Sequence, residues 1–346
     1  MLLTYKYVWD DIRHVQSFVN YIMLEVILKS PKLAVSELNG NVVIKKYWTL
    51  IQGVNPDLLL NPLSELFVIC KGLDRDKIKL LKRAVLVNNR ITGLCAGKLN
   101  PVRYNDLKSV FIANDDKKVP DLIKTICNNL YEKCLDRTAF TSKYGTLKSH
   151  YDKIVGKDSR CRACGITQRM LTKHSRYRNA FDHYLPKGIY PFVSVNFFNL
   201  IPTCDICNGK YKATKDTLFY KTRKKAFYPY SKKEYDIQVS VILHSSEILN
   251  LTPSDVDIKF SCIGRGDDYD YQEELKNWCR VYGIEEQYKS FCCSYSCVSL
   301  LSEIIGYGID DIRAIVKMME NTKEIDSNFL KLAMLKGVMD RLGIEY

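Results

Sequence analysis

The sequence predicts an α+β protein that is predominantly helical. Apolar side chains recur at three- and four-residue spacing in 1–139 and again in 272–346, as they do on the buried face of a helix. Alternation of apolar and polar residues, which is typical of strands, is confined to short segments. Two Cys-x-x-Cys pairs near the middle indicate a small unit held together by a metal ion. The 346 residues are enough for two or three domains.

The N-terminal part is expected to be a succession of helices. The first follows an acidic turn, and the last has Pro120 in its first turn, where the missing N–H of proline is harmless. An Asn-Gly pair within 33–48 predicts a hairpin turn. A loop and a short helix then lead from 141 to 159. The expected helices are 10–30, 61–73, 74–87 and 118–137.

The middle and C-terminal parts are expected to mix strands and helices. Short strands are predicted on both sides of a proline-rich loop, at 181–186 and 197–204, and a helix is predicted to begin at 207. Alternating residues predict two further strands at 235–245 and 254–262. Three helical segments follow at 272–306, 308–321 and 328–343.

The net charge of +13 is concentrated in the middle of the chain. Residues 150–233 carry 18 Lys/Arg against 5 Asp/Glu, whereas 234–346 carry 11 against 20. A basic middle segment favours a polyanionic partner, although a solvated basic surface has the same composition. The opposite charges of the two segments also favour their docking on each other.

The two Cys-x-x-Cys pairs are Cys161 with Cys164 and Cys204 with Cys207. Two residues between a pair of thiolates let both point at one ion, and two pairs make a closed, tetrahedral Zn²⁺ site of structural type. Polar turn residues around both pairs argue against four ordinary core cysteines. The odd total of 13 cysteines and the lack of an export signal favour a reducing, cytoplasmic location. The cysteines of 291–297 lie in an apolar segment and are expected to be free thiols.

Between the cysteine pairs lie Asp182, His183 and Asn199, and Asn208 directly follows the second pair. This order resembles the HNH, or ββα-metal, endonucleases. The string Asp-His-x-x-Pro-Lys, followed by Asn-Leu-x-Pro-x-Cys-x-x-Cys-Asn, is similar to the HNH nucleases of prokaryotic anti-phage defence systems of the Septu and retron-effector type. The resemblance covers about 140–233. The last motif residue of the family is often His, and here it is Asn208.

The resemblance implies a role for each of these residues. His183 would be the general base, Asp182 and Asn208 would hold one Mg²⁺ or Mn²⁺ ion, and Asn199 would position the hairpin loop. The residue types suit phosphodiester hydrolysis, because a neutral imidazole can take a proton from water near neutral pH. Carboxylate and amide oxygens are also suitable ligands for a hard cation. DNA is the expected substrate.

A run of basic and aromatic residues follows the second cysteine pair. Residues 209–233 contain nine Lys/Arg and one Asp, with Tyr and Phe interleaved. This composition suits phosphate contacts with strong salt dependence and little sequence preference. A basic helix face with its aromatic residues in the core is the alternative. The candidate contacts are Lys187, Lys210, Lys212, Lys215, Arg223, Lys224 and Lys225.

The expected organisation is an N-terminal, mainly helical domain at 1–139, a nuclease domain at 140–233 and an acidic C-terminal α+β domain at 234–346. No apolar run is long enough to span a bilayer, so no membrane contact is expected. The resemblance implies an ATPase or another defence protein as partner. A non-catalytic zinc module that binds nucleic acid or protein is the alternative, but it would not need the Asp182, His183, Asn199 and Asn208 set. A sequence-specific homing or restriction enzyme would need base-reading elements, which the flanks do not show.

Overall fold

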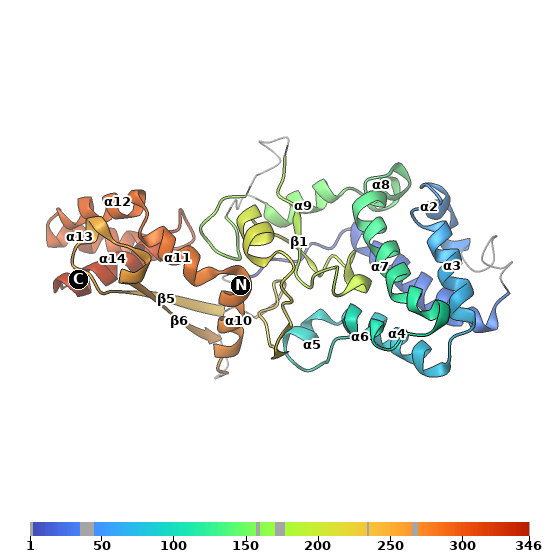
Figure 1. Cartoon of the computed structure of the whole chain (residues 1–346). Helices are drawn as coiled ribbons and strands as arrows, with labels where there is room; N and C mark the ends of the chain where they lie inside the picture. Colours follow the sequence, from blue (N-terminus) through green and yellow to red (C-terminus); the bar gives the residue numbers. More distant parts are fainter. Residues whose placement is uncertain are drawn as a thin grey trace.

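The computed structural model describes residues 3–34, 45–156, 160–169, 177–233, 235–264 and 269–345. Over these ranges the protein is a mostly helical α+β structure with three two-stranded antiparallel sheets, so the predicted class is confirmed. The turn of the hairpin expected at 33–48 lies outside the described residues. Figure 1 shows an elongated arrangement, with the N-terminal helices at one end, β5 and β6 with the last helices at the other, and β1 between them.

The N-terminal part contains nine α-helices in its described residues. The predicted helix at 10–30 is broken, since only its centre is α-helical and tighter or wider turns flank it. Asp74 caps the fourth helix by accepting hydrogen bonds from the backbone of Asp76 and Lys77, and Pro120 lies in the first turn of the seventh, as predicted. The helices are α1 Val15–Tyr21, α2 Trp48–Gln52, α3 Leu60–Lys71, α4 Arg75–Asn88, α5 Ile91–Cys95, α6 Tyr104–Lys108, α7 Val119–Asn129, α8 Thr138–Tyr144 and α9 Leu147–Val155.

The middle of the chain forms a short hairpin followed by a helical turn. β1 (Phe181–His183) pairs with β2 (Leu200–Pro202), and the next segment, η9 (Ile206–Lys212), is a wide helix of seven residues. The helix predicted from 207 ends early because Ala213 has a φ of +44° and turns the chain away. A second small hairpin follows, made of β3 (Phe219–Tyr220) and β4 (Thr222–Arg223).

The C-terminal part packs a long hairpin against helices. β5 (Tyr235–Leu243) and β6 (Val256–Gly264) pair along their whole lengths, and the last helix lies against β5. Gly337 allows this approach, because a Cβ there would lie 2.4 Å from the carbonyl oxygen of Val241. The helix predicted at 272–306 is three helices. The helices are α10 Gln272–Tyr282, α11 Ile284–Cys292, α12 Tyr295–Ile305, α13 Ile309–Asn321 and α14 Asn328–Leu342.

Two hydrophobic cores meet at the central hairpin. Phe181 and Leu200 pack with the N-terminal helices, whereas Tyr184 and the four clustered cysteines pack with the C-terminal part. The boundaries expected at 139 and 233 remain predictions, since the central segment contributes to both cores. No helix in the described ranges is long and apolar enough to cross a membrane.

Candidate metal centre and active site

The four cysteines of the two pairs form one buried cluster. Their sulfur atoms lie within 4.8 Å of one another, and none of the four residues is more than 1% exposed. The backbone N–H of Cys204 points at the sulfur of Cys161 over 3.3 Å, and Gln287 donates to the sulfur of Cys207 over 3.7 Å. Four thiols in this arrangement suit a structural metal ion such as Zn²⁺, because thiolates are its preferred ligands and the site is closed to solvent.

The C-terminal helices hold the first cysteine pair through its backbone. The indole of Trp278 on α10 donates to the carbonyl of Ala163, and the hydroxyl of Tyr288 on α11 donates to that of Cys164, both over 2.9 Å. The predicted docking of the two segments is therefore present. It relies on buried hydrogen bonds and apolar packing, with the Arg160–Asp326 ion pair at the edge.

His183, at the end of β1, is held in one orientation. Its Nε2 lies 2.9 Å from the carbonyl oxygen of Ser194. A carbonyl only accepts, so Nε2 carries the hydrogen and Nδ1 of the neutral ring keeps its lone pair. Tyr131, from the turn after α7, packs edge-on against the imidazole with a centroid distance of 4.3 Å. The ring is thus oriented by contacts from two parts of the fold.

The surroundings of His183 keep it neutral. Burial lowers its pKa to about 3, and the nearby charge of Lys187 acts in the same direction, while the bond to Ser194 opposes the shift. The ring is therefore unprotonated at neutral pH. A phosphate placed beside it would raise the pKa again, because an adjacent negative charge favours the imidazolium.

Asp182, which precedes His183, is enclosed. It is 1% exposed, and Oδ1 lies 2.6 Å from the ammonium of Lys212, which is equally buried. Oδ2 accepts a hydrogen bond of 3.1 Å from Tyr282, at the end of α10. Lys212 also donates to the backbone carbonyl of His183 over 2.7 Å. Lys212 is a candidate phosphate contact by sequence, and in this structure its side chain is the buried counter-charge of Asp182.

Asn199 fastens the loop between β1 and β2. Its side-chain oxygen accepts from the backbone N–H of Leu185 over 2.7 Å, and its amide nitrogen donates to the carbonyls of Leu185 and Val193 over 2.9 and 3.2 Å. Asn199 is fully buried. These bonds join the two ends of the loop that carries Lys187 and the carbonyl partner of His183.

The other candidate site residues differ in their exposure and in the partners of their side chains. Asn208, in η9, is half-buried, and its side-chain amide has no hydrogen-bond partner among the described residues. Lys210 is exposed, whereas Lys187 pairs with Glu132. Arg223 donates to several backbone carbonyls and has a structural role rather than a free surface charge. Lys215 is exposed, Lys224 is half-buried, and Lys225 bonds to the hydroxyl of Tyr269.

The pair Asp182 and Asn208 does not fit a divalent ion in this arrangement. Two hard oxygens, Asp182 Oδ1 and the carbonyl of His183, do converge on one cation, but that cation is the ammonium of Lys212. A second cation beside it would meet strong repulsion in a buried site. Binding of Mg²⁺ by Asp182 therefore requires Lys212 to withdraw.

Sequence reasoning missed three of these contacts. Tyr131, Lys212 and Tyr282 reach the Asp-His pair from different elements, and Tyr282 is 100 residues away along the chain. No local motif marks Tyr131 or Tyr282. Gly283, which follows Tyr282, gives a weak signal, because its φ of +59° ends α10 where the ring of Tyr211 packs.

Comparison with known proteins gives one partial similarity. The chain is 37% identical over 67 residues to the Septu protein PtuB of Bacillus thuringiensis, a stretch that covers 19% of this chain and 25% of that protein. The chain thus matches about a quarter of the length of this curated relative. No family model and no solved structure matches the chain.

Proposed function

We propose that the chain is an HNH-type endonuclease that hydrolyses phosphodiester bonds, with DNA as the expected substrate, in anti-phage defence. The observation that carries the proposal is the state of His183, a neutral imidazole whose bond to Ser194 leaves Nδ1 unprotonated. Its place on a hairpin beside a four-cysteine cluster supports the family assignment, and so does the partial similarity to a Septu protein. Cleavage of plasmid DNA by the purified protein, with His183→Ala beside it, is the direct test.

In the proposed reaction, His183 Nδ1 takes a proton from the attacking water. The bond between Nε2 and Ser194 stabilises the imidazolium that forms, because its N–H becomes a charged donor. Lys187, whose charge acts on His183, is placed to attract the phosphate once its pairing with Glu132 is exchanged for substrate. Asn199 holds the loop on which Lys187 lies.

A catalytic Mg²⁺ or Mn²⁺ remains part of the proposal only if Lys212 leaves Asp182. Its contribution would be the relief of charge on the phosphate and on the leaving oxygen. The structural Zn²⁺ would have a separate task, to fix the strand that carries His183 against η9. An ATPase partner is implied by the resemblance alone.

Substituting Lys212 with Met is expected to lower the free energy of unfolding by about 3–5 kcal/mol, because Asp182 is left as a buried charge without a partner. Urea unfolding followed by far-UV circular dichroism measures this loss. Millimolar MgCl₂ should recover part of it in Lys212→Met if Asp182 can bind the ion, and should have little effect on the parent.

Lys210→Met is the matched control, since Lys210 lies two residues away and is exposed. Its effect should stay within about 0.5 kcal/mol. A loss below about 1 kcal/mol in Lys212→Met would show that the ion pair does not stabilise the fold. A full loss with no recovery in MgCl₂ or MnCl₂ would contradict Asp182 as a metal ligand.

The stability of the protein should fall as the pH drops through weak acid. The pKa of His183 is lower in the folded protein than in the unfolded chain, where it is about 6.5. The unfolded state therefore binds the proton more readily, and folding loses stability as the pH falls from about 6.5 toward 3. Between about pH 7.5 and 5.5, His183→Gln should lose less of its melting temperature than the parent does. An equal loss would contradict the burial of a neutral ring.

A non-catalytic zinc module is the second candidate function. The observation in its favour is that Asp182 is fully engaged by protein groups and that none of its oxygens is exposed. Such a module would bind DNA with the salt dependence expected of the nuclease, but it would leave the DNA uncut. The plasmid assay therefore separates the two candidates.

A further inference from the structure

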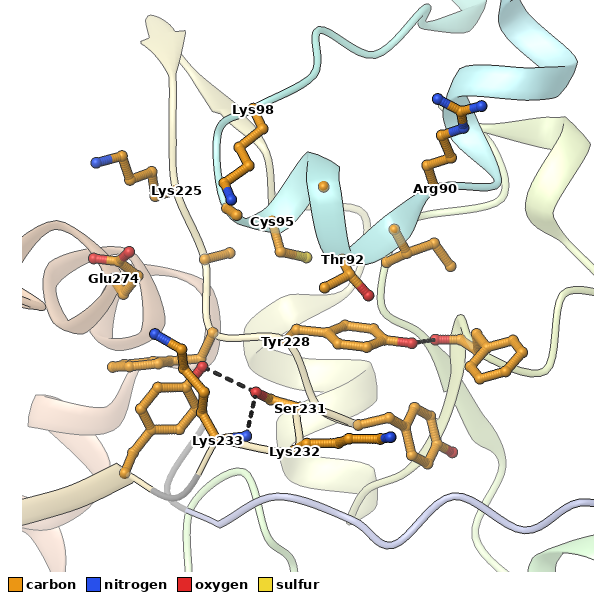
Figure 2. A pocket seen from close by; sticks show the side chains of 18 of the residues that line it. Arg90, Thr92, Cys95, Lys98, Lys225, Tyr228, Ser231, Lys232, Lys233 and Glu274 are labelled. Carbon is orange, nitrogen blue, oxygen red and sulfur yellow. Dashed lines mark hydrogen bonds between the residues drawn. The ribbon is translucent and has the colours of Figure 1, made fainter. Parts of the chain in front are cut away.

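A hollow of about 860 Å³ lies where the N-terminal, central and C-terminal parts of the chain meet. Its walls come from 89–98, from 225–235 and from 269–274, together with Phe198 (Figure 2). The volume is in the range of about 300–1,000 Å³ found for small-molecule sites. Asp182, His183, Asn199 and Asn208 are not among its lining residues, so the hollow is distinct from the proposed nuclease site.

Aromatic rings form much of the wall. The ring of Tyr271 is nearly parallel to that of Phe227, with a centroid distance of 6.0 Å, and Tyr235 packs edge-on against Tyr271. All three rings line the hollow. Such aromatic rings favour a ligand with a planar heterocycle, such as a nucleic-acid base, because the π-face of the heterocycle can stack on an aromatic side chain.

The rim is basic. Arg90, Lys98, Lys225, Lys232 and Lys233 line the hollow, and the acidic lining residue is Glu274. Figure 2 shows Lys98 and Lys225 on one side and Lys232 and Lys233 on the other. Within the described ranges, the side chains of Arg90, Lys98 and Lys232 have neither an ion-pair nor a hydrogen-bond partner. Free cations converging on one opening favour a ligand with phosphate groups.

Glu274 offers an unsatisfied acceptor to this hollow. The residue is 6% exposed, and its Oε1 accepts a hydrogen bond of 3.2 Å from Tyr269. Oε2 is buried and has no partner among the groups that the structure describes. A buried acceptor without a donor is costly, so it marks a place where an N–H group of a ligand would be held.

We propose that this hollow binds a nucleoside phosphate, with its base against the tyrosine rings, an exocyclic amino group on Glu274 and its phosphates between the lysines. One cavity combines aromatic rings, a carboxylate acceptor and a basic rim. A purely apolar ligand would leave the acceptor and the rim unused, and a purely anionic ligand would leave the rings unused. The ligand is either a free nucleotide or one nucleotide unit of a strand, since both share this chemistry.

Two hydrogen bonds connect the hollow to the proposed nuclease site. Asn89, which lines it, accepts a bond of 2.8 Å from Asn196, on the loop that Asn199 fastens. The hydroxyl of Tyr184, next to His183, donates to the backbone carbonyl of Phe227 in the wall. A ligand bound here would therefore contact residues that are hydrogen-bonded to both the loop and the first strand of the β1–β2 hairpin. The binding proposal itself does not depend on nuclease activity.

Isothermal titration calorimetry of the full chain tests the proposal. ATP, GTP, CTP and UTP are titrated one by one, and a short single-stranded oligonucleotide forms a separate arm. The double variant Lys98→Glu/Lys232→Glu should weaken binding at least tenfold. Lys82→Glu/Lys317→Glu, which changes the net charge equally at two exposed sites outside the hollow, should not. CTP should bind more tightly than UTP, which lacks the amino group, and Glu274→Gln should narrow this difference.

Saturable binding with these variant effects supports the site. If only free nucleotides bind, the ligand is a soluble effector. If the oligonucleotide binds tightly, the hollow contacts a nucleic-acid strand. No saturable binding in either arm overturns the proposal, and so does equal weakening by both double variants. Equal affinity for CTP and UTP overturns the role of Glu274. Because the lysine pair is exposed, its result stands even if Glu274→Gln fails to fold.

Discussion

Replacing His183 with alanine is expected to lower the rate of DNA cleavage by about 10²–10⁴-fold, the usual contribution of a general base. The fold should survive, because His183 is half-buried and its side chain is hydrogen-bonded to a backbone carbonyl. Initial rates on plasmid DNA at neutral pH measure the effect. The reason for the loss is specific: Nδ1 is the nitrogen left free to accept a proton by the bond from Nε2 to Ser194.

His244→Ala is the matched control for this substitution. His244 is an exposed histidine beyond β5 that pairs with Asp257 on β6, and it is not among the proposed site residues. Its rate should equal that of the parent. If His183→Ala, with an unchanged melting temperature, cut DNA as fast as His244→Ala, the assignment of His183 as general base would be wrong.

Replacing Cys204 with serine is expected to remove the bound metal and to unfold the central segment. Structural Zn²⁺ contributes about 10–16 kcal/mol to the folding of small zinc modules. This is as large as the whole stability of a typical domain, about 5–15 kcal/mol. The cluster also joins η9 to the helices α10 and α11, so its loss should expose the apolar residues around it. Zinc content and limited proteolysis measure both effects.

Cys293→Ser provides the control, because Cys293 is half-buried and lies outside the cluster. It should keep its zinc and its resistance to protease. Loss of zinc from Cys204→Ser with a native melting temperature and full activity would refute the view that the metal holds the β1–β2 hairpin in place.

The fold class and most helices could be predicted because they follow from local pattern. Pro120 and the paired alternation of β5 and β6 carry their own signals. The breaks could not be predicted from periodicity, since apolar spacing continues across Gly283 while its positive φ ends one helix and begins another. The four cysteines were predictable as a cluster because each Cys-x-x-Cys pair can point two sulfur atoms at one ion, and two such pairs complete a four-ligand site.

The surroundings of the Asp-His pair could not be predicted, because they depend on contacts between segments that are distant in sequence. Lys212 has the same sequence context as Lys210, and only the tertiary fold places one beside Asp182 and the other in solvent. Tyr282 reaches Asp182 because the C-terminal helices pack around the cysteine cluster, a contact between distant segments. Charge counts favoured the docking of the central and C-terminal segments, but they could not show that buried hydrogen bonds would hold the two together.

One measurement tests the central claim most directly. The purified protein and His183→Ala are incubated with plasmid, linear double-stranded and single-stranded DNA and with RNA, in Mg²⁺, in Mn²⁺ and in EDTA. The nuclease proposal predicts that the parent nicks or cuts at least DNA and that His183→Ala is nearly inactive. Loss of cleavage in EDTA would show that a divalent ion takes part once Lys212 has left Asp182. Binding of DNA by a folded, zinc-loaded protein that leaves every substrate intact would contradict the nuclease and favour the zinc module.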